Sequence, residues 1–379
     1  MSQLVVLGGG RVGAAMARDL ARDGRSNVVL ADRSRDALDR VADASITPRH
    51  EDLSTAEGVR RAVEGARLAI GAVPGPMGFA VARRVLEAGV DLVDISFFEE
   101  DAFELADVAR RVGRVCVVDA GVAPGLSNLV LGRAEASWER VDRFVCYVGG
   151  LPIARRLPWQ YKAPFSPIDV LAEYTRPARL REDGRLIERP ALGGVETIEI
   201  ESLGTLEAFE TDGLRTILRT SEVPTLVEKT LRYPGHRDRI ELLRDAGFLD
   251  EHPVELPSGV KVVPLELAAA LLFPQWQLED GEPELTAMRL VVEGIRDGRR
   301  QRETLDLLDR TDRTTGTSSM ARTTGYTATA VARVVADGLW TEPGVAALEH
   351  LGRDEAIHQR VLEDLEARGV VFERRVLSL

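Results

Sequence analysis

The sequence predicts an α/β fold, in which a doubly wound parallel sheet of the Rossmann type carries an inserted α+β domain with a mixed or antiparallel sheet. Two observations predict it. Between residues 4 and 118, short apolar runs alternate with amphipathic helical segments, which is the pattern of parallel βαβ units. From residue 143 onward, strand-like segments follow one another with helices spaced irregularly between them. A chain of 379 residues is also long enough for two domains.

The first strand and helix enclose a glycine-rich turn that is typical of dinucleotide binding. The apolar run Leu4–Leu7 leads into GGGRVG, which fits the pattern G-x-G-x-x-G and opens a helical segment. In this pattern Gly8 makes the tight turn, Gly10 lets the backbone approach a pyrophosphate, and Gly13 lets helix and strand pack closely. The helix N-terminus adds free N–H groups and a partial positive charge for the phosphates. A glycine-rich turn that binds nothing is the alternative.

The second strand, Val28–Ala31, ends in Asp32, 19 residues after Gly13. A carboxylate there can accept hydrogen bonds from the adenosine ribose and repels a 2′-phosphate, so the sequence favours NAD. The neighbouring Arg33 can partly offset that repulsion, which leaves NADP open. Asp52 can reach the adenine edge or remain a solvated loop acid. The residues expected to bind the cofactor are Gly8, Gly10, Arg11, Val12, Gly13, Asp32, Arg33, Asp52, Val73, Pro74 and Asp94.

The remaining segments of the first domain continue the alternation. Ligands of doubly wound sheets bind beyond the carboxyl ends of the strands, and Asp94 and Asp119 fall at such ends. Helices are predicted at Asp36–Ala42, Thr55–Val63, Pro76–Ala88 and Glu99–Val112. Strands are predicted at Ile46–Thr47, Leu68–Val73, Leu92–Ile95 and Val115–Val118.

The segment DAGVAPGLSN at 119–128 is either a domain linker or a loop that closes over the nicotinamide, and a helix at Leu126–Ser137 follows it. In the second domain, helices are predicted at Pro167–Glu173, Arg237–Ala246 and Pro264–Leu272. Strands are predicted at Phe144–Val148, Glu196–Ser202, Arg215–Arg219, Val260–Val263, Ala287–Glu293 and Gln301–Leu308, the last two pairing as a hairpin. Three stretches are polar and aperiodic, namely Leu157–Ser166, Glu207–Arg215 and Lys229–His236, and a fourth, Ser318–Tyr326, opens a long helix through Val335. Each can be a surface loop, but four of them in one domain favour a pocket.

Composition narrows the class of protein. The formal net charge of −12 argues against binding to nucleic acid or to anionic membranes. No apolar run approaches the ~20 residues that span a bilayer, and the chain enters its first strand at once, so we expect no signal peptide. Cys116 and Cys146 lie in apolar runs and are expected as buried free thiols in a reducing cytoplasm. No Cys/His cluster has metal-ligand spacing, so no metal site is expected.

Lysine is scarce in this chain. Only three of the 49 basic residues are lysines, namely Lys162, Lys229 and Lys261. The pKa of an amine can be tuned, whereas a guanidinium stays charged, so a lysine kept against this bias is a candidate for chemistry. Lys261 lies in a predicted hairpin and is expected to be incidental, which leaves Lys162 and Lys229.

Several longer segments together resemble the saccharopine dehydrogenase-like family, most closely its lysine 6-dehydrogenase branch. They are GGGRVG at 8–13, DAGVAPGLSN at 119–128, YVGGLP at 147–152, LEAFETDGLRT at 206–216, KTLRYPGH at 229–236 and MARTTGYTAT at 320–329. Motifs of this length are far more specific than G-x-G-x-x-G, and they extend from the first strand to the final helices. YKAPFSP at 161–167 is similar to a segment of the saccharopine-reducing relatives.

The resemblance implies an NAD(P)-binding Rossmann domain and an inserted substrate domain. It also implies that helices at Met320–Asp337 and Asp354–Arg368 return to the nucleotide domain, so that residues 1–122 and 320–379 form one domain and residues 123–319 the other. Members of the family act on small amino acid substrates and are homo-oligomers, so the same is expected here.

The expected function is NAD-dependent oxidative deamination of the terminal amine of L-lysine or a close analogue, by hydride transfer to nicotinamide. One alternative is imine reduction with NAD(P)H, as in saccharopine reductases and carboxynorspermidine dehydrogenases. Another is a catalytically silent NAD-binding sensor. The intact polar loops at 161–166, 211–216 and 229–236 count against the sensor, because a silent protein does not need them.

Amine oxidation requires a neutral amine, because an ammonium has no lone pair. The side chain of free lysine has a pKa of about 10.4, so a base or a desolvating pocket is needed. The candidates for handling protons are Lys229, His236, Asp119 and Asp212.

The substrate itself needs a cation for its carboxylate and a wall for its aliphatic part. Arg232 and Arg322 can clamp a carboxylate bidentately or form ordinary ion pairs. Tyr161 can line the aliphatic part or pack in the core. Lys162 completes the set of expected substrate-binding residues.

Overall fold

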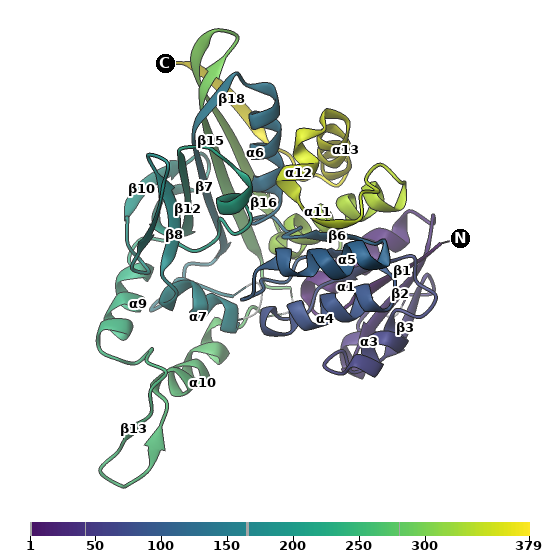
Figure 1. Cartoon of the computed structure of the whole chain (residues 1–379). Coiled ribbons are helices and arrows are strands. Elements are labelled where there is room, and N and C mark those ends of the chain that lie inside the picture. Colours follow the sequence, from purple (N-terminus) through teal and green to yellow (C-terminus); the bar gives the residue numbers. More distant parts are fainter. Residues whose placement is uncertain (1, 42, 164–166, 280) are drawn as a thin grey trace.

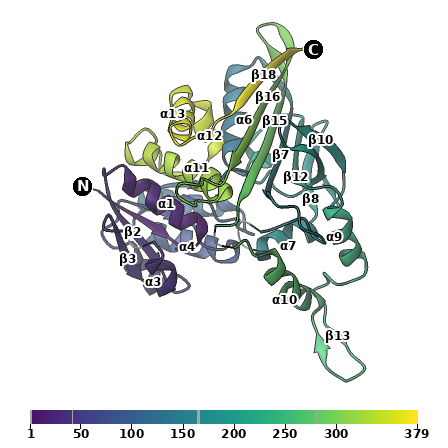
Figure 2. The same ribbon diagram turned by 180° about the vertical axis from the view of Figure 1, so that it is seen from behind.

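The computed structural model describes residues 2–41, 43–163, 167–279 and 281–379. In Figure 1 the N-terminal elements, in purple and blue, lie beside the C-terminal helices in yellow, and the teal and green segments form a second body around a long hairpin. The reverse view in Figure 2 shows the N-terminal helix against a C-terminal one. Tertiary folding therefore brings α1 and α11 together, although they lie far apart in the sequence. Part of the YKAPFSP segment, residues 164–166, lies outside the described residues, as does residue 42.

Among the described residues, the first sheet has seven strands, all parallel, in the order β17-β6-β5-β4-β1-β2-β3. The order reverses between β1 and β4, and ligands bind at such a switch point. The strands are β1 (Gln3–Leu7), β2 (Asn27–Asp32), β3 (Ile46–His50), β4 (Leu68–Gly71), β5 (Asp91–Asp94), β6 (Val115–Val118) and β17 (Gly344–Ala347).

Successive residues of a strand point to opposite faces of the sheet. Both faces of this sheet carry apolar side chains, and helices cover both. Val6 packs in one core with Met16 of α1 and Val331 of α11, while Val5 packs in the other with Val81 of α4. The helices of this domain are α1 (Arg11–Arg22), α2 (Arg35–Asp39), α3 (Ala56–Ala62), α4 (Gly75–Glu87), α5 (Ala106–Val112), α11 (Ser319–Ala336), α12 (Leu348–Arg353) and α13 (Glu355–Glu366), with a 3-10 helix at Ala102–Leu105.

The second sheet is mixed. Its main path runs β10-β11-β12-β7-β15-β16-β18, with β8 and β9 attached to β12, and only the β12–β7 pair among those described is parallel. Its strands are β7 (Arg140–Pro152), β8 (Ala178–Glu182), β9 (Arg185–Arg189), β10 (Glu196–Ile200), β11 (Gly204–Glu210), β12 (Thr225–Arg232), β15 (Glu284–Arg296), β16 (Arg299–Arg310) and β18 (Glu373–Ser378). The predicted fold class is therefore confirmed, including the β15–β16 hairpin.

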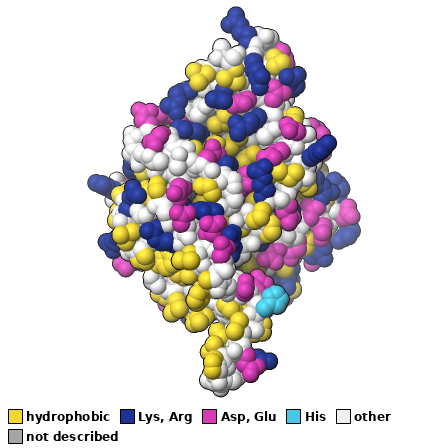
Figure 3. All heavy atoms as spheres, turned by 90° about the vertical axis from the view of Figure 1, so that its left-hand side faces the viewer, with side chains coloured by type: hydrophobic (Ala, Val, Ile, Leu, Met, Phe, Trp, Pro, Cys, Tyr) yellow, Lys and Arg dark blue, Asp and Glu magenta, His cyan; other side chains and the backbone are white. Residues whose placement is uncertain are grey.

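Further helices surround the second sheet, and a small hairpin projects beyond α10, away from the sheet (Figure 1). They are α6 (Leu126–Ser137), α7 (Pro167–Thr175), α8 (Ile217–Thr220), α9 (His236–Asp245) and α10 (Pro264–Trp276), and the hairpin is β13 (Val254–Glu255) with β14 (Lys261–Val262). Figure 3 shows apolar side chains gathered on the lower part of the molecule. The exposed apolar residues of α9, α10 and the hairpin include Leu242, Val254, Val260 and Leu271. Apolar patches of this kind often contact other proteins. The homo-oligomer stays a prediction.

Three secondary-structure predictions are wrong in this domain. Glu207–Arg215 is predicted as a loop, but its first four residues belong to β11 and pair with β12. Arg215–Arg219 is predicted as a strand. Arg215 instead has a φ of 52°, which lies in the left-handed region and is incompatible with a strand, and the helix α8 follows it. Lys229–His236 is predicted as a loop, but its first four residues belong to β12, which pairs with β7 and β11. These polar residues form a strand because distant partners supply their hydrogen bonds.

The C-terminal residues contribute one strand to each of the two sheets. β17 pairs with β6 of the first sheet, whereas β18 pairs with β16 of the second, so residues 373–378 lie apart from the domain to which the sequence assigns them. Cys116 and Cys146 are buried free thiols, as predicted. No helix among the described residues is both long and apolar enough to cross a bilayer.

Candidate functional site

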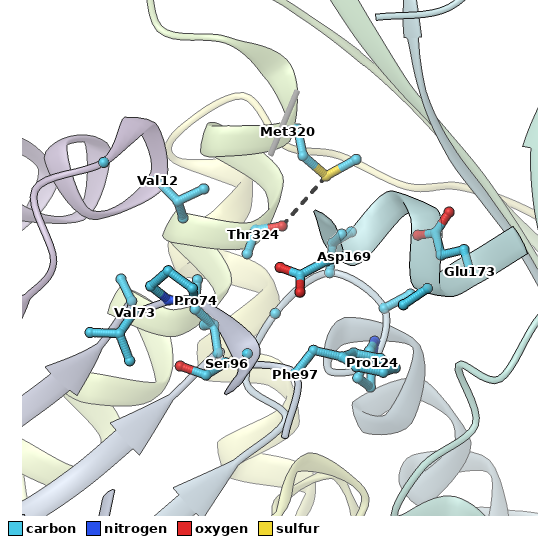
Figure 4. Close-up of a pocket in the computed structure, with 18 of the residues that line it drawn as sticks. Val12, Val73, Pro74, Ser96, Phe97, Pro124, Asp169, Glu173, Met320 and Thr324 are labelled. Atoms are coloured by element: carbon cyan, nitrogen blue, oxygen red, sulfur yellow. Dashed lines mark hydrogen bonds between the residues drawn. The ribbon is translucent and has the colours of Figure 1, made fainter. Parts of the chain in front are cut away.

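A cavity of about 660 Å³ lies where the carboxyl ends of the first sheet face the second sheet. The glycine loop, the ends of β2, β4 and β5, and α11 line it from the first domain, and β7, α7 and β12 line it from the second. Figure 4 shows part of this lining, with Asp169 of α7 directed into the space bordered by Thr324 and Pro74. The volume suits a small ligand. The predicted residues that line it are Gly8, Gly10, Arg11, Val12, Gly13, Asp32, Arg33, Asp52, Val73, Pro74, Asp212 and Arg232.

The glycine loop has the geometry that a dinucleotide requires. Gly8 has a φ of 109°, and a Cβ on it would lie 2.5 Å from the carbonyl oxygen of Ala72. A Cβ on Gly13 would lie 1.9 Å from the Gly8 carbonyl oxygen, so the helix packs on the loop only with glycine there. A Cβ on Gly10 would meet no atom within 4 Å, and Gly10 lines the cavity at the start of α1. The residues present therefore fit a pyrophosphate approaching Gly10 and the α1 N-terminus.

Asp32 is tied to the glycine loop. Its Oδ2 accepts a hydrogen bond from the Gly9 N–H at 2.6 Å, and its Oδ1 accepts one from the Ser34 N–H at 2.7 Å. Arg33 and Asp52 lie with it in the cavity lining. The carboxylate thus stands where β2 ends, at the position that contacts a ribose in this architecture.

Replacing Asp32 with glycine is expected to weaken binding of NAD more than that of NADP. The variant removes the group that can accept from a ribose hydroxyl and that repels a 2′-phosphate, while Arg33 remains. We expect the ratio of the NADP to the NAD dissociation constant to fall by about tenfold. Titration of both dinucleotides into wild type and variant measures it. An unchanged ratio would remove Asp32 from the cofactor assignment.

Two predicted acids, Asp94 and Asp119, lie beneath the cavity and outside its lining. Asp94 is buried, its Oδ1 accepts from the Ser96 N–H at 2.6 Å, and burial raises its pKa to about 7. Asp119 is buried with its Oδ1 3.8 Å from Nε of Arg215, and burial again raises its pKa. The neighbouring Ser96 lines the cavity instead.

On the second-domain side, Arg232 is held by three bonds. Its Nη2 donates to Glu173 Oε2 at 2.8 Å, its Nε donates to the Tyr174 hydroxyl oxygen at 3.0 Å, and its Nη1 donates to a backbone carbonyl oxygen. Its guanidinium also lies 4.5 Å from the ring centroid of Tyr161, which is buried outside the lining. The ring of Tyr161 therefore packs against the guanidinium from outside the cavity lining.

His236 is buried outside the cavity lining and fixes Tyr174. Its Nδ1 lies 2.7 Å from the Trp159 carbonyl oxygen, so this nitrogen carries the proton and donates it. Its Nε2 then accepts from the Tyr174 hydroxyl at 3.0 Å. Burial, with Arg232 nearby, lowers the pKa of His236 to about 3, so the ring stays neutral. The imidazole orients Tyr174, which orients Arg232.

The other predicted side chains point elsewhere. Lys229 follows Glu228 on β12 and so projects to the opposite face, where its Nζ donates to the Gly194 carbonyl oxygen at 2.6 Å. The Nζ of Lys162 donates to the Gln277 carbonyl oxygen at 2.9 Å. Arg322 pairs with Asp309. The structure therefore does not place these three cations in the cavity lining. Asp212 does line it, held by a bidentate pair of 2.8 Å bonds from Arg179.

Several lining residues escape the sequence reasoning. Asp169 and Glu173 lie one turn apart on α7, and Figure 4 shows both on that helix. Glu228, Thr230 and Arg232 are every second residue of β12, and all three line the cavity. That period of two is the signal that could have found them, had the segment been assigned as a strand. The lining residues without a sequence prediction of a role include Asp169, Glu173, Arg176, Thr211, Glu228, Thr230, Met320 and Thr324.

Comparison with known proteins agrees with this architecture. The saccharopine dehydrogenase NADP binding domain matches residues 4–117, and the saccharopine dehydrogenase C-terminal domain matches residues 121–370. The NADP(+), L-glutamate-forming saccharopine dehydrogenase of Schizosaccharomyces pombe is 22% identical, with 100% of both chains covered. The carboxyaminopropylagmatine dehydrogenase of Synechocystis is also 22% identical, over 93% of this chain and 94% of that one.

Among solved structures, the apo saccharopine dehydrogenase (L-Glu forming) from Saccharomyces cerevisiae superposes with a TM-score of 0.80, at 19% identity and with 100% of both chains covered. That likeness establishes the shared fold. Since the two domain matches together extend over nearly the whole length, the chain belongs to the saccharopine dehydrogenase family of oxidoreductases, and its first domain is the family's NAD(P)-binding domain.

Proposed function

We propose that the protein catalyses the NAD-dependent oxidative deamination of the terminal amine of L-lysine or a close analogue. The observation that carries this proposal is the charge of the cavity beyond its dinucleotide end. Two arginines line this part among the described residues, Arg176 and Arg232, and a third, Arg179, pairs with Asp212 from outside the lining. The acids that line it are more numerous, namely Glu99, Asp169, Glu173, Asp212 and Glu228. Burial raises the pKa of Glu228 to about 8, so the negative charge at neutral pH comes from the other four.

An acidic wall favours a substrate with an excess of amines. Lysine carries two ammonium groups and one carboxylate at neutral pH, so its net charge opposes that of the wall. Saccharopine carries three carboxylates and two amines, and it would need more guanidiniums than the wall supplies. This balance supports a diamino acid over saccharopine.

The binding residues divide naturally between the two domains. A nicotinamide dinucleotide bound along the glycine loop supplies the two-electron acceptor for the oxidation. Arg232 can hold the substrate carboxylate, because a guanidinium has five N–H donors and three of them make the bonds described above. The lining acids hold the ammonium groups. The apolar Val148 and the backbone of Gly149 and Gly150 border the remaining space.

One panel of assays tests the proposal. NADH formation is measured with L-lysine and other diamino acids, beside NADPH oxidation with aminoadipate semialdehyde plus glutamate. We expect turnover of lysine with NAD and none in the second assay. Turnover in the second assay alone would establish imine reduction instead. Binding of NAD without turnover in either assay would identify the silent sensor.

A further inference from the structure

Three polar side chains, Glu228, Thr230 and Thr211, meet on the second-domain wall of the cavity. Glu228 and Thr230 face the cavity from β12, and Thr211 faces it from the end of β11. All three are buried, with 6%, 4% and 4% of their surface exposed for Glu228, Thr230 and Thr211 respectively. They therefore have the cavity as their route to solvent and substrate.

The hydrogen bonds among them have a defined direction when Glu228 is ionised. The hydroxyl of Thr211 donates to Glu228 Oε2 at 2.6 Å, which uses its single proton. The two threonine hydroxyl oxygens lie 2.9 Å apart, so the hydroxyl of Thr230 must donate to that of Thr211. The oxygen of Thr230 keeps its acceptor lone pairs. The three groups thus form a chain that begins with an acceptor and ends on a carboxylate.

We propose that Glu228 accepts the proton that an ammonium substrate must lose, through the hydroxyls of Thr230 and Thr211. The proposal rests on the function proposed above. The N–H bond of the ammonium breaks and its proton passes to the Thr230 oxygen, the Thr230 proton passes to the Thr211 oxygen, and the Thr211 proton forms an O–H bond on Glu228. The products are a neutral amine with its lone pair and a neutral carboxyl group, so charge and protons balance.

The loop at residues 211–213 is shaped around this carboxyl group. The Gly213 N–H donates to Glu228 Oε2 at 3.2 Å. A Cβ on Gly213 would lie 2.5 Å from the carboxyl carbon of Glu228, so a side chain there would displace it. Glycine at 213 therefore makes room for the carboxyl group and also contributes a hydrogen bond to it.

The surroundings tune Glu228 for proton exchange near neutral pH. Burial, together with the nearby carboxylates of Glu173 and Asp212, raises its pKa to about 8, although the hydrogen bonds from Thr211 and Gly213 oppose the rise. A base works best when its pKa lies near the operating pH. The other charged or titratable groups facing this region are Arg232 on the same strand, Arg179 bonded to Asp212, and the buried thiol of Cys146 on β7.

Other candidates are less well placed for this role. Lys229 projects to the far face of β12, and His236 stays neutral at a pKa of about 3. Asp212 is engaged on both oxygens by Arg179. Asp169 also faces the cavity, so it is the competing candidate for the base, and the experiment must distinguish it from Glu228.

The test compares Glu228→Gln with wild type in lysine oxidation. We expect kcat to fall by about 100-fold or more, while the KM for lysine stays within about threefold. In wild type, kcat/KM rises with pH through about 8 as Glu228 ionises. That rise should be absent from the variant, leaving the rise near 10.4 that belongs to the amine of free lysine. The amide retains the shape and the acceptor for Thr211, so the fold is preserved.

Two further variants separate this role from a structural one. Thr211→Val removes the hydroxyl that links Thr230 to Glu228, so kcat should fall as it does in Glu228→Gln. The lost hydrogen bond also lowers the pKa of Glu228 in wild type, so any rise in kcat/KM that remains should move to higher pH. Glu293→Gln alters another buried carboxylate, paired with Arg302 away from the cavity, and should leave the profile unchanged. A rise near pH 8 that persists in Glu228→Gln, or that disappears in Asp169→Asn alone, would overturn the proposal.

A binding measurement distinguishes failure of this proposal from failure of the proposed function. Lysine is titrated calorimetrically into the complex with NADH, where no turnover occurs, in two buffers of different ionisation enthalpy. Binding an ammonium beside Glu228 should release about one proton at pH 7 and almost none at pH 9.5, whereas Glu228→Gln should release none at either pH. Equal proton release by both proteins would reject Glu228. Lysine that fails to bind the wild-type complex would reject the proposed function.

Discussion

Gly13→Ala is expected to weaken dinucleotide binding by about 100-fold and to lower the free energy of unfolding by about 3 kcal/mol. The reason is the 1.9 Å separation between a Cβ at this position and the Gly8 carbonyl oxygen. The atom in the way belongs to the backbone, so α1 must move off the loop. That movement displaces the helix N-terminus from the phosphates. Titration with NADH and urea denaturation measure the two effects.

Gly10→Ala is the matched control, because its effect should be confined to binding. Gly10 has a φ of −65°, which alanine adopts, and a Cβ there meets no atom within 4 Å. The new methyl group enters the cavity where the pyrophosphate approaches. We expect weaker NADH binding with a change in unfolding free energy below about 1 kcal/mol. Wild-type affinity in Gly10→Ala, or wild-type stability in Gly13→Ala, would contradict the assigned roles of the two glycines.

Arg232→Met is expected to raise the KM for lysine by about 100-fold. The guanidinium of Arg232 is buried on the second-domain side of the cavity. A charge-assisted hydrogen bond from it to a substrate carboxylate contributes about 1.5–3 kcal/mol. Stability should also fall by about 1–3 kcal/mol, because Glu173 and the Tyr174 hydroxyl lose their donor. Steady-state kinetics with lysine, together with NADH titration, separate substrate binding from cofactor binding. The NADH affinity should not change.

Arg289→Met provides the comparison for Arg232→Met. Arg289 is likewise held by a carboxylate, through a bidentate pair with Asp306 with bonds of 2.6 and 2.9 Å, but it lies outside the cavity lining. It should lose stability without a change in the KM for lysine. A KM that rises equally in both variants would show that the effect of Arg232→Met comes from general destabilisation and would remove Arg232 from substrate binding.

The first domain was largely predictable because its signals are local. The glycine spacing, the apolar runs and the acid at the end of β2 are all contained within 30 or so consecutive residues, and a right-handed βαβ unit places them in one way. The expected cofactor residues at the glycine loop, at β2 and at Val73-Pro74 accordingly line the cavity. Asp94 does not, because the backbone turns at Ser96 and buries the carboxyl group beneath the strand ends.

The second domain was less predictable because its polar residues depend on distant partners. The segment that contains Lys229 and His236 has the composition of a loop, but pairing with β7 and β11 extends it through Arg232. Strand formation then fixes an alternation that aims Glu228 and Arg232 at the cavity and Lys229 away from it. The scarcity of lysine singled out Lys229, although it says nothing about which face the side chain occupies.

By itself, the sequence determined the fold class, the dinucleotide loop and the family, because these depend on short-range patterns and on motifs long enough to be specific. The tertiary structure alone decided which carboxylates share the cavity with Arg232, and that His236 acts behind it through Tyr174. The physical reason is that the direction of a side chain on a strand depends on its register with neighbouring strands. That register is established by hydrogen bonds between segments that lie far apart in the chain.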